Sequence, residues 1–349
     1  MLFMKKVFFL LACGLRVLAV DAQSGDRQPF LEKSFSRSAV HELDAETSGG
    51  NISVYGSASG DARVEVYVQG DNGRWKDLSK EEIQKRLDEQ YDLTIALDGG
   101  KLKAIAKGKP NLRNWNHGLS ISFRIYTPVE VATHVRTSGG NLVLKDLSGN
   151  EDFRTSGGNI DVDHLVGTIR GRTSGGNVSI TDSHNDIDLE TSGGNMDATR
   201  CEGKIQLGTS GGNVGLRSVK GNIRATTSGG QVDGGQITGE LQTHTSGGNI
   251  DLSEVSASLE ASTSGGNIHV SFLSTGKYVD LSNSSGDITV QLPQGQGMDL
   301  RISGERVHAT ALNNFKGDQD EKHISGTVNG GGTPVKVDGN GGSVHVSFK

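Results

Sequence analysis

The chain has 349 residues, of which 51 are glycine and 5 are proline, and its hydrophobic content is 33%. That hydrophobic content is low for a conventional globular core in a chain of this length. The formal net charge is −6, with acidic and basic residues interspersed, which leaves no basic surface of the kind that nucleic-acid-binding proteins need. Beyond the amino-terminal segment Cys201 is the sole cysteine, so no internal disulfide is expected.

The amino terminus has the features of an export signal. Two lysines precede an apolar run over 7–20, and the small residue Ala22 follows it, which predicts cleavage after Ala22. Lipidation of Cys13 is the alternative. No later stretch reaches the ~18 apolar residues that a membrane helix needs. We therefore expect a signal peptide over 1–22, a linker over 23–38, and a chain exported to the periplasm, the cell surface or the extracellular space.

The first structured unit is expected over residues 39–55. It contains the tetrapeptide Thr-Ser-Gly-Gly, beginning at Thr47, between two short runs in which apolar residues alternate with polar ones. Alternation with a period of two is typical of strands with one buried face. The segment therefore predicts one rung of the repeat that dominates the chain further on. Residues 56–130 interrupt the repeat, and we expect them to form an α+β insert that caps it.

The expected elements of the insert follow from local patterns. Ser79 and Glu82 form a capping box, and Leu78 and Ile83 a hydrophobic staple, which together predict the start of a helix. Alternation of apolar residues, and the turn Asp-Gly-Gly, predict strands and one hairpin. The expected elements are a strand over 63–68, a helix over 79–90, hairpin strands over 91–97 and 102–107, and a strand over 119–126.

A polar loop within the insert carries the one local binding hypothesis. Trp115 is flanked there by amide side chains and a histidine. An exposed tryptophan can stack on a sugar or anchor a protein partner. The candidate ligand-binding residues are therefore Asn114, Trp115, Asn116 and His117. The alternative is that Trp115 packs the insert against the repeats.

The region 131–275 repeats every 18 residues. Thr-Ser-Gly-Gly begins at Thr137, Thr155, Thr173, Thr191, Thr209, Thr227, Thr245 and Thr263. Counting threonine as position one, positions six, eight, fifteen and seventeen are mostly apolar, although Glu151 stands at position fifteen of the first rung. Each rung therefore consists of two short strands and two turns. Because one rung is too small to enclose a core, we expect the rungs to stack as a parallel β-solenoid.

The repeated Thr-Ser-Gly-Gly-Asn predicts one corner of the coil. Paired glycines suit a tight turn with positive φ, and the residue that follows them can stack its amide on those of neighbouring rungs. This structural corner ladder consists of Asn141, Asn159, Asn177, Asn195, Asn213, Gln231, Asn249 and Asn267. No outward column carries a row of aromatic residues, which argues against a sugar-stacking platform and leaves a polar binding strip open.

Residues 276–349 depart from the strict spacing, and we expect irregular carboxy-terminal rungs and a cap, with 341–346 closing the rod. The recurrent TSGGNI, the stretch GDITVQLP over 286–293 and the tail ISGTVNGGGTPVKV over 324–337 resemble the bacterial β-solenoid family of putative adhesins, a domain of unknown function. The resemblance covers about 39–349. It implies a solenoid fold and a surface or envelope role, and it supplies no catalytic residues.

Enzymatic chemistry finds little support in the columns of the repeat. Parallel β-helices include polysaccharide lyases and hydrolases, which gather carboxylates at one place. The aspartates of the seventh column recur at about every other rung, roughly 10 Å apart. The candidate carboxylates are Asp161, Asp163, Asp182, Asp186, Asp188, Asp197, Asp233 and Asp251. The histidines, which lie in five different columns, are His134, His164, His184, His244 and His269.

Metal binding and thiol chemistry are not predicted either. A calcium roll needs G-G-x-G-x-D, whereas Gly-Gly-Asn is followed here by an inward aliphatic residue. Cys201 shares position eleven with apolar residues and is expected to be buried. The other members of that column are Leu147, Leu165, Val219, Ile237, Val255 and Leu273.

The sequence thus predicts an all-β protein, a parallel β-solenoid of 18-residue two-strand rungs with a small α+β insert near the amino terminus. The predicted function is a non-catalytic, exported envelope or surface protein with an adhesin-like binding or scaffold role. Its expected partner is a glycan or protein ligand, and no cofactor is predicted. The alternative is a polysaccharide-active β-helix enzyme, a lyase or hydrolase.

Overall fold

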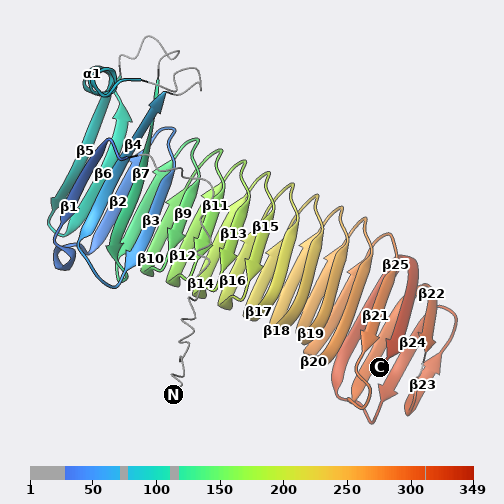
Figure 1. The fold of residues 1–349 in the computed structure, drawn as a ribbon. Coiled ribbons are helices and arrows are strands. Elements are labelled where there is room, and N and C mark those ends of the chain that lie inside the picture. The colour runs from blue at the N-terminus through green and yellow to red at the C-terminus, as the bar shows by residue number, and fades with distance from the viewer. Residues whose placement is uncertain (1–27, 71–77, 111–117, 311) are drawn as a thin grey trace, which may run out of the picture.

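The computed structural model describes residues 28–70, 78–110, 118–310 and 312–349. They form a rod of stacked strands, with the single α-helix of these ranges, α1 (Lys80–Gln90), near one end (Figure 1). The described residues include no helix with the length and apolar character of a membrane span. The predicted signal peptide and the alternative lipidation site, Cys13, lie outside the described residues.

The regular part of the rod consists of two rows of strands joined by two corners per rung. The first strand row contains β8 (Ala132–Thr137), β10 (Ser148–Arg154), β12 (Val166–Thr173), β14 (His184–Thr191) and β16 (Glu202–Gly208). The second strand row contains β9 (Leu142–Lys145), β11 (Ile160–Asp163), β13 (Val178–Thr181) and β15 (Met196–Thr199). Further along, one long strand serves both rows in each rung, namely β17 (Val214–Thr226), β18 (Val232–Thr245), β19 (Ile250–Thr263) and β20 (Ile268–Asn283).

The rungs pair in parallel, as predicted. Ile169 of β12 faces Ile187 of β14, and Ile160 of β11 faces Val178 of β13, so each residue stands opposite its equivalent in the next rung. The inward positions form one continuous core, in which Ile160, Val162 and Ile169 are at most 1% exposed. Burial of one such aliphatic side chain contributes about 1.5–3 kcal/mol, and stacking makes this burial possible because one rung is too small to enclose a core. The predicted parallel β-solenoid is confirmed.

The amino-terminal rung lies inside the stack and not at its end. Strand β2 (Glu42–Thr47) pairs with β6 (Lys101–Gly108) on one side and with β8 on the other. Strand β3 (Ile52–Ser57) likewise lies between β7 (Leu119–Pro128) and β9. The insert therefore supplies the outermost parallel rung. Strand β5 (Tyr91–Asp98) pairs antiparallel with β6, and β4 (Ala62–Gly70) pairs antiparallel with β7. Strand β1 (Leu31–Phe35) pairs antiparallel with β4, and the short helix η1 (Arg37–Ala39) follows β1.

The local patterns of the insert predicted its elements well. The backbone N–H of Glu82 donates to Ser79 Oγ at 3.3 Å, which caps α1. The other half of the capping box does not form, because the Glu82 carboxylate accepts a hydrogen bond from Arg86 Nε at 2.7 Å instead. The predicted hairpin forms from β5 and β6, and Gly99 and Gly100 both take positive φ at its turn.

The carboxy-terminal end is also interleaved, which corrects the expected closing rung. Strand β25 (Thr333–Phe348) lies between two sets of earlier strands. On one side it pairs with β20 and β21 (Ile288–Leu292), and on the other side it pairs with β22 (Met298–Thr310). Strand β24 (His323–Val328) pairs antiparallel with β22, and β23 (Phe315–Gln319) pairs antiparallel with β24 and completes the rod. The last segment of the chain is thus covered by an earlier one, and the exposed edge is a short strand, as is usual where edge pairing must be limited.

The glycines of the repeated corner serve close packing and not positive φ, contrary to the expectation. None of the paired glycines of the 18-residue repeats has a φ in the left-handed region. A Cβ on Gly158 would lie 1.8 Å from the Gly140 carbonyl oxygen of the preceding rung, so a side chain has no room there. Left-handed residues occupy the opposite corner, with φ between 49° and 58°, at Asp146, His164, Asp182, Arg200, Ser218, Gln236 and Glu254.

The eleventh column is buried for most of its length, and Cys201 is 1% exposed. Leu273, which was expected in this column, is 65% exposed. The reason is an irregularity between β19 and β20 that brings Phe272 opposite Val255, so that Phe272 takes the inward place.

Candidate functional site

The polar side chains of the repeated corner are largely used by the fold. Thr173 Oγ1 donates to the Gly158 carbonyl oxygen of the preceding rung at 2.9 Å and accepts from the Gly176 N–H at 3.3 Å. Asn159 Oδ1 accepts a hydrogen bond of 2.8 Å from the backbone N–H of Asn177. The corner ladder therefore joins side chain to backbone across rungs, and not amide to amide.

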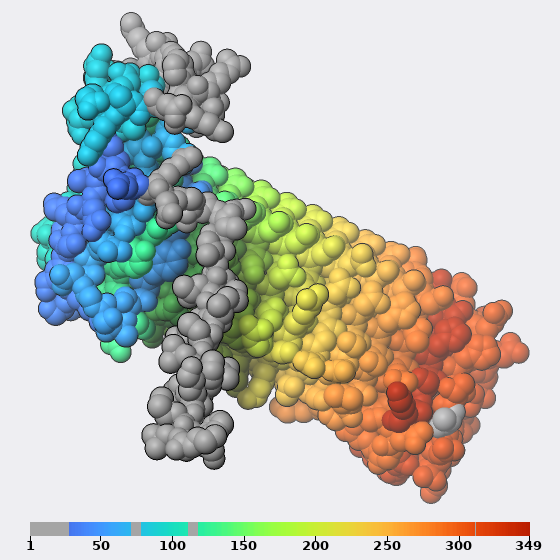
Figure 2. Space-filling model, viewed as in Figure 1, coloured from blue at the N-terminus to red at the C-terminus, as the bar shows by residue number. Residues whose placement is uncertain are grey.

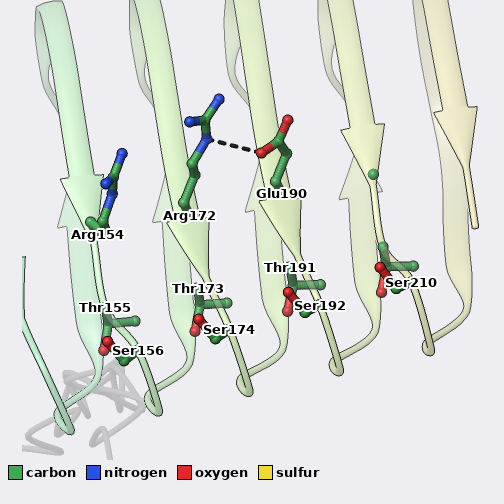
Figure 3. A pocket seen from close by; sticks show the side chains of 12 residues that line it. Arg154, Thr155, Ser156, Arg172, Thr173, Ser174, Glu190, Thr191, Ser192 and Ser210 are labelled. Atoms are coloured by element: carbon green, nitrogen blue, oxygen red, sulfur yellow. Dashed lines mark ion pairs between the residues drawn. The ribbon is translucent and has the colours of Figure 1, made fainter.

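The serine at position two of each corner is different, because its side chain is exposed. An open groove of about 480 Å³ follows this serine row on the first strand row (Figure 3). Its exposed polar side chains come from four rungs and are Arg154, Arg172, Glu190, Ser156, Ser174, Ser192 and Ser210. Neighbouring strands lie about 4.8 Å apart, so the groove presents one hydroxyl at each such step.

The charges of the groove are unevenly paired. Arg172 Nε lies 2.9 Å from Glu190 Oε2, the ion pair drawn in Figure 3. Arg154, one rung earlier, forms no ion pair or hydrogen bond with any described residue. Gly208 occupies the same position one rung after Glu190, so the groove is unobstructed there. An unpaired guanidinium beside hydroxyl groups can bind an anionic group that also accepts or donates hydrogen bonds.

The aspartates of the second strand row come closer together than the sequence suggested. Asp233 and Asp251 face each other on adjacent rungs, so this pair is an exception to the spacing of about 10 Å expected for many members of the column. Burial and the neighbouring Asp251 charge raise the pKa of Asp233. Asp251 is in turn 3.0 Å from His269 Nδ1. Neither aspartate lines the groove.

A second polar cluster brings together residues that the sequence had treated as scattered. His164 Nδ1 lies 2.7 Å from Asp163 Oδ1, and Asp182 lies within reach of the same histidine. Asp182 is held by two hydrogen bonds of 2.6 Å from Arg200, which lower the pKa of its carboxyl group. Lys145 Nζ is 3.8 Å from Asp163. Because the carboxylates already face cationic side chains, the cluster is poorly suited to a metal ion.

Sequence reasoning did not single out the groove. The candidate residues Asn114, Trp115, Asn116 and His117 lie outside the described residues. A usable signal was present at position eighteen, where arginine occurs in three consecutive rungs as Arg136, Arg154 and Arg172.

Comparison with known proteins identifies a family over almost the whole chain. A family model described as Toastrack DUF4097 matches residues 34–347. Among solved structures, a putative cell adhesion protein from Clostridium sporogenes is similar at 12% sequence identity, over 91% of this chain and 98% of that chain, with a TM-score of 0.18. A likeness of that size carries no functional conclusion. No curated protein matches the chain.

Proposed function

This chain belongs to the Toastrack DUF4097 family, and from that premise we propose that it is a non-catalytic, exported envelope or surface protein that binds an acidic glycan along its first strand row. The observation that supports this most directly is the guanidinium of Arg154, which has no partner among the described residues and lies in a groove lined by exposed serine hydroxyls. The regular rungs form a continuous surface along the rod (Figure 2).

The chemistry of the groove favours a polymer with acidic and hydroxyl groups. A guanidinium binds a carboxylate or sulfate through two parallel hydrogen bonds. The serines at the corner, such as Ser156 and Ser174, offer further hydrogen bonds at intervals of about 4.8 Å. An extended glycan can meet several rungs at once, so that individually weak contacts add up along the chain.

The groove supports binding better than cleavage. Glycoside hydrolysis usually needs two carboxyl groups on either side of the scissile bond. Glu190 is the one carboxylate among the residues that line the groove, and Arg172 already neutralises it. The closer pair, Asp233 and Asp251, lies on the other strand row.

The test is a binding comparison between acidic and neutral polysaccharides. Polygalacturonate and a sulfated glycan should bind the wild-type chain, and a neutral glucan should not. Arg154→Ala should weaken binding about tenfold, the effect of losing a charge-assisted hydrogen bond of roughly 1.5 kcal/mol. Gly208→Tyr should block the groove without disturbing the fold, because a Cβ there meets its nearest atom, Thr226 Oγ1, at 3.7 Å.

A matched control is Arg217→Ala, which removes a cation from the second strand row and should leave binding unchanged. Binding that is insensitive to both groove variants would show that the site lies elsewhere. Failure of every acidic glycan to bind the folded protein would refute the proposed ligand class.

A further inference from the structure

Two histidines far apart in the sequence meet near the carboxy-terminal end of the second strand row. His308 of β22 stands directly opposite His345 of β25 in their parallel pairing. The two ring centroids are 5.6 Å apart, and the ring planes differ by 14°. Both side chains are exposed. The residues are 37 positions apart (345 − 308), and the insertion of β25 beside β22 is what brings them together.

These two rings differ from several other histidines in their hydrogen-bond and ion-pair partners. Neither forms a hydrogen bond or ion pair with any described residue, so each ring keeps a nitrogen lone pair available when neutral. Five other histidine rings contact a carboxylate or hydroxyl group, namely His134, His164, His244, His269 and His323.

We propose that His308 and His345 form a binding site for a divalent transition metal ion such as Zn²⁺, Ni²⁺ or Cu²⁺. Neutral imidazole is the common protein ligand for these ions. Two nitrogens on a tetrahedral zinc ion are about 3.3 Å apart, given Zn–N bonds of about 2.0–2.1 Å. Facing residues on strands about 4.8 Å apart meet this spacing once the exposed rings rotate about their side-chain bonds.

The surroundings leave part of the coordination sphere open. Thr289 of β21 lies beside His345, and Thr310 and Ser347 follow the two histidines along their strands. Arg306, two residues before His308, is the charged residue nearest along these paired strands. With two protein ligands the ion keeps water, which a partner's ligand atom can replace. The site is separate from the groove of the first strand row and does not depend on the glycan-binding proposal.

The experiment is a Zn²⁺ titration of the full chain without an affinity tag, measured by competition with a chromophoric chelator at neutral pH. One zinc ion per chain should bind at this pair, and His308→Ala and His345→Ala should each weaken its binding at least tenfold. His164→Ala is the control, because it removes the histidine of the Asp163, His164 and Asp182 cluster and should leave this binding unchanged.

Cu²⁺ gives an independent readout. Its electron paramagnetic resonance spectrum should show coupling to two nitrogens in the wild-type chain and to fewer in either variant. All three substitutions are at exposed side chains, so equal melting temperatures should verify the fold. No zinc binding by the wild-type chain, unchanged affinity in both alanine variants, or a loss confined to His164→Ala would overturn the proposal.

Discussion

The buried carboxyl group of Glu151 should make the protein less stable as the pH rises. Glu151 occupies the core position that Ile169 and Ile187 hold in the next two rungs, and it is 0% exposed. Its Oε2 is hydrogen-bonded to the Thr133 hydroxyl, whereas Oε1 has no hydrogen-bond partner among the described residues. Burial raises the pKa of Glu151 to about 7, against the smaller opposing effect of Thr133.

The direction of the pH effect follows from proton linkage. The folded chain binds this proton more tightly than the unfolded chain, whose carboxyl pKa is near 4.5. The contribution to stability is therefore complete below 4.5 and is lost as the pH rises through about 7. At about 1.4 kcal/mol per pKa unit, the difference between the folded and unfolded pKa values of Glu151 corresponds to roughly 3 kcal/mol of unfolding free energy.

Glu151→Gln isolates this effect, because glutamine stays neutral and its carbonyl oxygen still accepts a hydrogen bond from Thr133. Urea unfolding should show the stability of the variant relative to the wild type increasing by roughly 3 kcal/mol between about pH 4 and pH 8.5. Stacked rungs can unfold in parts, so hydrogen exchange of the first rungs should be followed as well. A stability difference that stays constant within about 1 kcal/mol across this range would refute the reasoning.

Two further predictions concern the corner and the buried thiol. Gly176→Ala should destabilise the protein by about 3 kcal/mol or more, because its Cβ would lie 1.9 Å from the Gly158 carbonyl oxygen. Gly175→Ala, whose Cβ would be 3.7 Å from the nearest backbone oxygen, should change stability by less than about 1 kcal/mol, and equal urea midpoints for the pair would contradict this packing. Cys201 is 1% exposed, and burial raises the pKa of its thiol. In a Cys13→Ser chain, in which Cys201 is the remaining thiol, a thiol reagent should therefore react only after unfolding. Rapid reaction of the native protein would count against burial of this thiol.

The solenoid could be predicted because its information is local and repeated. Eight corners at a fixed interval, with aliphatic residues at fixed places between them, define which side chains point inward and which rung each one meets. The helix and hairpin of the insert were predicted for the same reason, since Ser79 and the Gly99-Gly100 turn act on residues next to them.

The order of rungs at the two ends could not be predicted in this way. Residues 42–57 form β2, which lies between β6 and β8, and β3, which lies between β7 and β9. Residues 333–348 form β25, which lies between the earlier strands β21 and β22. These arrangements depend on which exposed strand edges remain to be paired, and an edge is a property of the assembled sheet and not of any segment.

Sequence alone therefore determined the parallel 18-residue coil, its buried columns and the place of its corners, because a periodic pattern specifies neighbours directly. Only the tertiary structure decided that the second corner glycine faces a carbonyl oxygen, that Glu151 lies wholly inside the core, that Arg154 lacks a partner among the described residues, and that His308 faces His345. Each of these depends on distances between atoms of different rungs, which packing sets and which a one-dimensional pattern does not contain.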